Sequence, residues 1–345
     1  MEQEHKRRVR YRGTHPRKFE EKYKEHQPEK YKDDVEKIIQ GGKTPAGMHI
    51  SIMVDEILEF LQIKPGQIGY DATLGYGGHT RRMLEKLEGK GHMYATDVDP
   101  IESEKTRERL AALGFGPEIL TIRRMNFANI DQVAPEQKFD FVLADLGVSS
   151  MQIDNPQRGF TFKQDGPLDL RLDPTAGTTA AQRLRELDEE ELAAMLIENS
   201  DEPYADEIAK AVMKTFRRGG TIETTRQLYA LIEDTLGFLP VKERKDAVKK
   251  SCQRTFQALR IDVNSEFEVL YDFLEKLPHV MNPGGRIAVL TFHSGEDRLV
   301  KKAFKQHMKE GLYSDVASDV IRPSAQECFR NPRAHSTKMR WAIRG

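Results

Sequence analysis

Apolar and polar residues follow a helical period over some stretches of the chain and form short, continuous apolar runs over others. The short runs are bounded by Gly, Asp or Pro, which is typical of buried strands. Strands that alternate with helices of about a dozen residues form βαβ units, so the pattern predicts a doubly wound, mostly parallel α/β sheet. The first predicted strand ends just before Asp71, and the others span 92–96, 119–123, 139–144, 286–292 and 339–343. The predicted helices span 52–61, 81–87, 101–113, 253–277 and 296–307.

The alternation stops between residues 154 and 250, where polar turns are followed by amphipathic helical patterns and no strand pattern occurs. We therefore expect an α/β domain formed by 46–153 and 251–345, interrupted by an inserted helical domain at 154–250. Residues 1–45 hold too few apolar side chains for a core of their own and are expected to form a separate arm. The helical patterns of the insertion lie at 178–199, 205–216 and 225–236.

Charge and cysteine content narrow the class of protein. The 345 residues include 54 Lys and Arg and 55 Asp and Glu, so a protein that is basic all over is excluded, while local basic patches are not. The longest apolar runs are far shorter than the roughly 20 residues of a membrane span, and residues 1–30 lack the apolar segment of a secretory signal. Two cysteines, Cys252 and Cys328, form neither a disulfide framework nor a Cys-rich zinc site, and no His or Cys spacing predicts a metal site. We expect a soluble, cytoplasmic protein.

The arm is basic at its start. Between Lys6 and Lys18 it carries seven basic residues and no acidic one, with Tyr11 and Phe19 interleaved. Clustered Lys and Arg release counterions from a polyanion, so the segment is a candidate RNA-binding arm. A solvated, partly helical arm is the alternative, and the sequence leaves both open.

A glycine-rich turn between the first predicted strand and its helix is the candidate cofactor loop. It contains Gly75, Gly77 and Gly78, and Asp97 follows Gly75 by 22 residues at the end of the next strand. A carboxylate in that position can accept hydrogen bonds from both hydroxyls of an adenosine ribose. The alternative is that these acidic residues only shape turns.

The residues around the glycines distinguish two kinds of cofactor. In a dinucleotide-binding loop the third Gly opens the helix and the pyrophosphate lies on the amino end of that helix. Here Gly78-His79-Thr80 stands at that place, and Asp71 precedes the loop. A carboxylate would repel pyrophosphate, whereas it suits the cationic groups of S-adenosylmethionine. The sequence therefore favours the methyl donor.

The loop after the fourth predicted strand is the candidate chemical site. It runs from Asp145 to Gln152 and holds a carboxylate, two hydroxyls and an amide, at the edge where doubly wound sheets bind ligands. Methyl transfer is an in-line displacement, so the enzyme mainly positions the acceptor. If Asp145 accepts an N–H bond of an exocyclic amine, it favours the pyramidal form that attacks. A carboxylate on the cofactor side is the alternative role.

Three further features each allow two interpretations. Phe160 and Phe162 could stack on an extruded base, although packing beneath the loop is the more common role of such residues. His293, after the fifth strand, could contact the base or cap the next helix. The basic residues from Arg333 to Arg340 could hold phosphate or guard an edge strand against pairing.

Taken together, these motifs resemble the bacterial 16S ribosomal RNA cytosine N4-methyltransferases (the MraW/RsmH family). The resemblance covers about 47–344 and is carried by six ordered motifs, at 71–80, 97–100, 145–152, 158–173, 254–264 and 292–298. It implies a class I methyltransferase fold with an inserted substrate-recognition domain, and S-adenosylmethionine as the donor. The implied product is N4-methylcytidine near the peptidyl site of the decoding region of the small subunit. The cofactor contacts that carry over by motif are Gly77, Gly78, His79, Asp97, Phe127, Asp145 and Gln152, with Phe127 flanking the adenine.

The chain also departs from the usual pattern of that family. It has Gly295 where Leu is usual, and His335 and Thr337 where Arg and Ala are usual, and the basic arm is absent from the typical member. We interpret it as a divergent member. Two alternatives stay open: a paralogue that methylates a different RNA cytosine, and a non-catalytic RNA-binding factor of ribosome assembly. A nicotinamide-dependent oxidoreductase is disfavoured by the loop sequence. The sequence leaves the oligomeric state open, a homodimer included.

Overall fold

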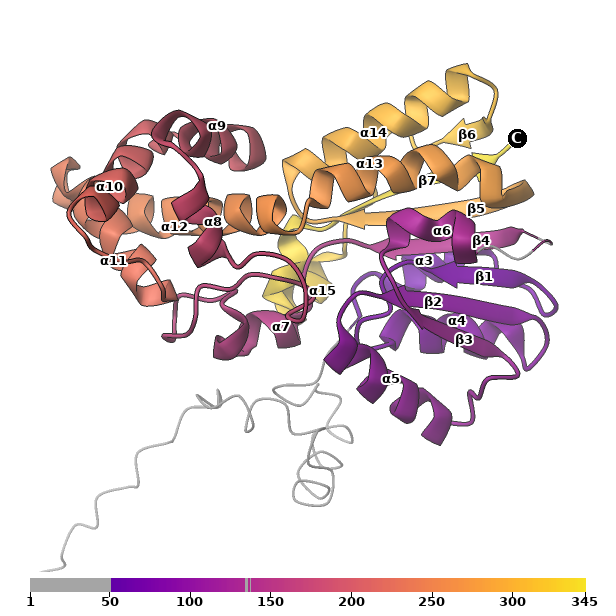
Figure 1. The fold of residues 1–345 in the computed structure, drawn as a ribbon. Helices are drawn as coiled ribbons and strands as arrows, with labels where there is room; N and C mark the ends of the chain where they lie inside the picture. Colours follow the sequence, from indigo (N-terminus) through magenta and orange to yellow (C-terminus); the bar gives the residue numbers. More distant parts are fainter. Residues whose placement is uncertain (1–50, 134–135, 137) are drawn as a thin grey trace, which may run out of the picture. The chain divides into compact units, whose positions relative to one another are not determined.

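The computed structural model describes residues 51–345 apart from 134, 135 and 137, and residues 51–345 form one compact unit. The predicted arm therefore lies outside the described residues. The unit is built on a seven-stranded sheet with the strand order β3-β2-β1-β4-β5-β7-β6 (Figure 1). Strands β1 to β5 run parallel, and β7 is antiparallel to both β5 and β6. The strands are β1 (Ile68–Asp71), β2 (His92–Asp97), β3 (Leu120–Arg124), β4 (Phe139–Asp145), β5 (Met281–Thr291), β6 (Tyr313–Val316) and β7 (Lys338–Arg344).

Helices cover both faces of this sheet. On one face α3, α4 and α5 enclose a core with side chains such as Met83, Met93 and Phe141. On the other face α6, α13 and α14 enclose a second core with Tyr70 and Phe273. This arrangement confirms the predicted doubly wound, class I methyltransferase fold. The helices are α3 (Val54–Leu61), α4 (Gly78–Leu87), α5 (Pro100–Ala112), α6 (Ile130–Val133), α13 (Glu266–Lys276) and α14 (Ser294–Lys309).

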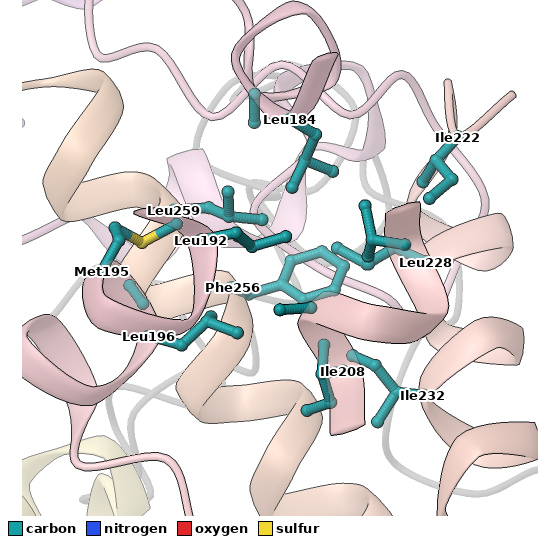
Figure 2. Close-up of a cluster of buried hydrophobic side chains, with 14 of the residues drawn as sticks. Leu184, Leu192, Met195, Leu196, Ile208, Ile222, Leu228, Ile232, Phe256 and Leu259 are labelled. Carbon is teal, nitrogen blue, oxygen red and sulfur yellow. The ribbon is translucent and has the colours of Figure 1, made fainter. Parts of the chain in front are cut away.

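The inserted segment has a hydrophobic core of its own, shown in Figure 2. Phe256 and Leu259 of the long helix pack there against leucines and isoleucines of the four shorter helices, and all of these residues are buried. This separate core fits the predicted helical insertion. The helices are α8 (Ala180–Glu186), α9 (Glu189–Ser200), α10 (Ala205–Arg217), α11 (Thr225–Thr235) and α12 (Val241–Val263).

The main differences between the structure and the sequence prediction concern two helical stretches and one strand. The stretch 178–199 is two helices, because the Asp188 side chain accepts a bond from the Glu191 N–H and starts α9. The predicted helix 253–277 is also two, because α12 starts at Val241 and ends at Val263, and α13 begins after Ser265, which has a left-handed φ of 48°. The boundary at residue 250 thus falls inside α12, whose second half packs in the core of the insertion. Strand β6, with the sequence YSDV, was not predicted because it is short and half polar.

Short segments complete the edge of the sheet at which β1 to β5 end. They are α7 (Ser150–Asp154), α15 (Ala325–Arg330) and the 3-10 turns Phe127–Asn129, Pro156–Arg158 and Pro332–Ser336.

Candidate active site

Three aspartates lie at the ends of β1 and its neighbours β2 and β4, and the strand order reverses between β1 and β4. Asp71 ends β1 and is in register with Ala95 of β2 and Leu143 of β4. Asp97 and Asp145 each lie two residues further along their strands. Because side chains two residues apart point to the same face of a sheet, the three carboxylates share one face at the carboxyl edge. Doubly wound sheets bind their ligands at this crevice.

The glycine loop after β1 follows a path that side chains would block. Gly75 and Gly77 have φ values of 47° and 78°, and a Cβ on Gly77 would lie 2.7 Å from Thr106 Cγ2. Thr106 Oγ1 donates to the Gly75 carbonyl at 2.6 Å, and Arg109 donates to the Tyr76 carbonyl at 2.7 Å. Helix α5 therefore holds the loop from outside and leaves its inner side to a ligand.

Asp71 holds the start of that loop. Its Oδ2 accepts a bond from Thr80 Oγ1 at 2.6 Å, and its Oδ1 accepts the Thr73 N–H at 3.0 Å. The carboxyl is buried, and burial raises its pKa above the ordinary value. Since both oxygens have protein donors, the geometry gives Asp71 a role in shaping the loop, and a direct contact with the donor stays a prediction.

Asp97 ends β2 and connects two backbone segments. Its Oδ2 accepts the Gly75 N–H and its Oδ1 accepts the Asp99 N–H, both at 2.8 Å. Burial raises the pKa of Asp97 to about 6 against the lowering effect of these bonds, and the neighbouring carboxylates Asp99 and Asp71 raise it further. Each carboxylate oxygen has a second lone pair, so Asp97 can still accept bonds from a ribose diol.

Asp145 and His79 form a pair between β4 and the start of α4. His79 Nε2 lies 2.9 Å from the Ile52 carbonyl, which can only accept, so Nε2 donates there, while Nδ1 lies 3.5 Å from Asp145 Oδ2. The other oxygen, Asp145 Oδ1, is buried and has no hydrogen-bond partner among the described residues. Burial raises the pKa of Asp145 to about 6, although His79 lowers it. A buried acceptor without a donor is the feature expected of a ligand site.

A network that the sequence did not predict connects the two halves of the site. Asp99 is fully buried, and its Oδ1 accepts the first N–H groups of α5. Its Oδ2 accepts Gln152 Nε2 at 3.0 Å and Arg158 Nη1 at 2.6 Å. Gln152 also accepts the Ser149 N–H, and Arg158 donates to the Leu172 carbonyl. The predicted donor contact Gln152 thus has a structural role in this network; its contact with the donor stays a prediction.

His293 lies beyond the end of β5, the neighbour of β4. Its Nε2 is 3.2 Å from Glu296 Oε1, and Glu296 Oε2 accepts the Phe292 N–H at 2.7 Å. Burial alone would raise the pKa of Glu296, but His293 and the nearby Arg260 guanidinium lower it below its ordinary value. Glu266, His293 and Glu296 could be taken for a metal site, yet Arg260 binds both oxygens of Glu266, at 2.8 and 2.9 Å. We therefore interpret the cluster as an internal ion network.

The aromatic candidates differ in their surroundings. Phe162 stacks on Tyr229 and contacts Phe256 edge-on, and Phe160 packs against the same core, so the packing interpretation of both is confirmed. Phe127 is half-buried after β3, two residues past Met125, whose N–H donates to the Asp97 carbonyl. That position, beside the end of β2, fits a residue that flanks the adenine of the donor, which stays a prediction.

The basic residues at the start of β7 are paired inside the fold. Lys338 and Arg340 both donate to Asp297, at 3.1 and 2.6 Å, and Arg333 pairs with Asp154 at 2.8 Å. A phosphate site at Lys338 and Arg340 is therefore not supported.

In the part of the chain that the structure describes, no helix is long and apolar enough to cross a bilayer.

Comparison with known proteins gives a consistent set of relatives. A 344-residue match to "Ribosomal RNA small subunit methyltransferase H 1" of Agathobacter rectalis is 69% identical and covers 99% of both chains. "Ribosomal RNA small subunit methyltransferase H 2" of Alkaliphilus metalliredigens is 61% identical, again over 99% of both. "Ribosomal RNA small subunit methyltransferase H" of Thioalkalivibrio sulfidiphilus is 39% identical over 98% of its own length but 87% of this chain. This chain is thus longer than that relative, which agrees with the expectation that a typical family member lacks the basic arm.

Solved structures are more distant. A SAM-dependent O-methyltransferase from Thermotoga maritima matches with a TM-score of 0.40 and 11% identity, covering 90% of this chain and 70% of the other. An rRNA methylase from Streptococcus thermophilus gives a TM-score of 0.39 and 12% identity, covering 84% and 93%. Both TM-scores are low, so these two structures add nothing to the relationship that the sequence relatives give. The family model described as "MraW methylase family" matches residues 46–344, and the chain belongs to this family.

Proposed function

We propose that this protein methylates the exocyclic N4 amine of a cytidine in the 16S RNA of the small ribosomal subunit, near the decoding and peptidyl sites, with S-adenosylmethionine as the methyl donor. Family membership and the names of the relatives support ribosomal RNA methylation. The observation that carries the chemistry is Oδ1 of Asp145 at the crevice between β1 and β4, which is buried and has no hydrogen-bond partner in the described part of the chain.

The residues of the crevice fit the donor. A free lone pair on each carboxylate oxygen of Asp97 supports assigning the ribose hydroxyls to this residue, and Gly75, whose N–H it accepts, adds no side chain there. The carboxylates favour a cationic ligand over a pyrophosphate. When it is bound, S-adenosylmethionine supplies a methyl group on a positively charged sulfur.

Asp145 is assigned to the acceptor amine. An aromatic amine is a poor nucleophile because its lone pair is delocalised into the ring, and a hydrogen bond from one N–H to Asp145 Oδ1 localises that pair. The same oxygen can take the proton that the amine loses on methylation. A pKa of about 6 keeps Asp145 mostly ionised at neutral pH and makes it a stronger base than an ordinary aspartate. His79 stabilises the charged form from the other side.

His293 is assigned to the acceptor side as well. It follows β5 by two residues, and β5 is the neighbour of the strand that carries Asp145. Glu296 fixes its ring. In this position His293 contacts the base or its ribose, while the inserted domain and the basic arm supply phosphate contacts.

The cofactor assignment is tested by titrating the protein with S-adenosylmethionine in a calorimeter. The Asp97→Ala variant should lose roughly 100-fold or more in affinity, because two hydroxyls lose a charged acceptor. Asp55→Ala, which removes an exposed carboxylate of α3, is the matched control and should bind normally. Normal affinity in Asp97→Ala would refute the assignment.

The acceptor assignment is tested by single-turnover transfer of a labelled methyl group to small subunits that lack the modification, followed by mapping of the modified nucleotide. Asp145→Ala should lower the rate by a factor on the order of 100 or more and leave RNA affinity nearly unchanged. Asp140→Asn, at the other end of β4, controls for effects on the strand. An unchanged rate in Asp145→Ala removes this residue from the mechanism, and a product other than N4-methylcytidine removes the proposed reaction.

The arm can be tested separately, by deleting residues 1–45. If it binds RNA, the deletion weakens binding and flattens its dependence on salt. An identical salt slope would assign the arm another role.

A further inference from the structure

The segment between β6 and β7 forms an ordered loop at the edge of the sheet that carries the active site. We call residues 322–337 the edge loop. Its two ends are joined by an antiparallel bridge between Ile321 and Met339, with both backbone hydrogen bonds formed, at 3.0 and 2.8 Å. The loop contains α15 and the following 3-10 turn, which Figure 1 draws in yellow.

Strand register fixes how far this loop lies from the chemistry. Asp145 of β4 is paired with Leu290 of β5, Leu290 with Met339 of β7, and Met339 with Ile321. Neighbouring strands are about 4.8 Å apart, so three steps place the base of the loop roughly 14 Å from Asp145. A few nucleotides of single-stranded RNA can span this distance.

One side of the edge loop is fastened to the body of the protein. Glu327 accepts the Met53 N–H at 2.7 Å, and Arg333 donates to Asp154 of α7 at 2.8 Å. Ala334 and Thr337 are fully buried. The loop is therefore held in place by a contact within its helix and by contacts after it.

The edge loop also exposes an aromatic ring and basic groups to solvent. Phe329 is 88% exposed, the highest value among the large apolar side chains described, and it has no ring contact with any described residue. Arg322 and Arg330 are also exposed and form no ion pair or side-chain hydrogen bond within the described part of the chain. Burying a phenylalanine side chain stabilises a folded protein. Phe329 is instead exposed on an anchored loop, so its ring is available to a ligand.

We propose that the edge loop binds the single-stranded RNA next to the target cytidine, with an unpaired base stacked on Phe329 and phosphates paired with Arg322 and Arg330. Proteins recognise unpaired bases by stacking them on exposed aromatic rings, with basic side chains along the backbone. This assignment rests on the proposed function, since it names the surface that holds the flanking strand of the same substrate. The exposed Phe238 of the insertion is a weaker candidate, because its ring already packs edge-on against Tyr204.

Binding of the full-length protein to a naked 16S RNA transcript and to a short single-stranded RNA tests the stacking contact. Phe329→Ala should weaken both by roughly tenfold or more, and Phe329→Trp should restore affinity, whereas Phe329→Leu should not. Met308→Ala, an exposed apolar residue at the far end of α14, is the control. Unchanged affinity in Phe329→Ala overturns the proposal. Binding to whole small subunits is measured in parallel, and a loss seen only there also overturns the proposal, because it would assign the ring to a protein contact.

The charged contacts have their own matched control. The double variant Arg322→Ala/Arg330→Ala should reduce the slope of log affinity against log salt by about 1.4, the value for two phosphates of a single strand. Lys301→Ala/Lys305→Ala removes the same charge from the exposed face of α14 and should change the slope less. Equal changes in the two double variants would contradict a specific surface.

These measurements separate the two proposals. S-adenosylmethionine affinity should be unchanged in every edge-loop variant. If the wild-type protein transfers no methyl group to cytosine while Phe329→Ala still weakens RNA binding, the proposed function fails and the RNA surface stands. If the wild type methylates cytosine and Phe329→Ala binds RNA normally, the edge-loop proposal alone fails.

Discussion

Replacing Asp145 by asparagine should make the ligand-free protein more stable at neutral pH while it removes most of the activity. The reason is the cost of holding this carboxylate charged in the fold. Burial raises its pKa from an ordinary value of 3.8 to about 6, so the folded protein holds the carboxylate proton more tightly than the unfolded chain does. Above pH 6 the folded state has to keep a poorly solvated charge, which the neutral amide of the variant would not carry.

The magnitude follows from the shift. Each pKa unit corresponds to about 1.4 kcal/mol, so a shift of roughly two units sets an upper value of about 3 kcal/mol. The variant also loses the favourable contact with His79, so we expect a net gain of about 1–3 kcal/mol above pH 7, or a rise of roughly 2–6 °C in Tm. Below the unfolded pKa near 4 the wild-type carboxyl is neutral in both states, and the gain should vanish.

Urea unfolding of both proteins from pH 4 to pH 8, without the donor, measures this gain. Asp297→Asn is the matched control with the opposite sign, because burial would raise the pKa of Asp297 but its bonds to Arg340 and Lys338 lower it. That variant should lose stability at neutral pH, and the loss should fade as the pH falls towards the lowered pKa. If Asp145→Asn is destabilised at pH 7.5, or if its effect does not change between pH 4 and pH 7, the reasoning about a strained, charged Asp145 is wrong.

Three other predictions concern the reaction and the packing around the site. The rate of methyl transfer at saturating substrate should fall about tenfold per pH unit below about 6, as Asp145 is protonated, and a flat profile down to pH 5 would contradict its role. Arg158→Ala should cost about 3–5 kcal/mol in chemical unfolding, because it leaves Asp99 charged and buried, and Arg158→Lys should cost less. Gly295→Leu should lower the free energy of unfolding by about 1–3 kcal/mol, since a Cβ there would lie 2.6 Å from Phe267 Cζ. Adding Phe267→Ala should recover part of this loss. An unchanged stability of Gly295→Leu would show that the Phe267 ring moves freely.

The sequence predicted the parallel sheet well because strands buried on both faces are continuous apolar runs that end in polar turns. It could not divide 178–199 or 253–277 correctly, because the amphipathic period continues across both breaks. The signals that end those helices are local: the capping bond of Asp188, and the left-handed backbone of Ser265. The Asp188-x-x-Glu191 spacing was readable and is the signal that could have located the first break.

For the candidate site, the motifs identified the residues but not their partners. Asp71, Asp97 and Asp145 follow from strand ends, whereas the bond from Gln152 to Asp99 joins residues 53 positions apart on different loops. Periodicity carries no information about such contacts. The same limit applies to Lys338 and Arg340, whose pairing with Asp297 depends on how α14 packs beside β7.

We expect Gly295 to depart from the usual family residue, and its surroundings give this departure a physical meaning. A side chain at this position would collide with Phe267 and would lie 3.2 Å from His293 Nδ1. The glycine and the phenylalanine therefore fill one space together, beside a candidate residue for the acceptor.

The Asp99 network has a consequence for thermal inactivation of the protein. One buried carboxylate starts α5, beside the proposed donor site, and accepts bonds from Gln152 and Arg158, which begin the proposed acceptor side. These bonds link the two halves, so heat or a mutation that breaks this network should loosen both. On heating, the protein should lose its affinity for the donor and its affinity for RNA at the same temperature. We do not expect a partly unfolded form that still binds the donor but no longer binds RNA.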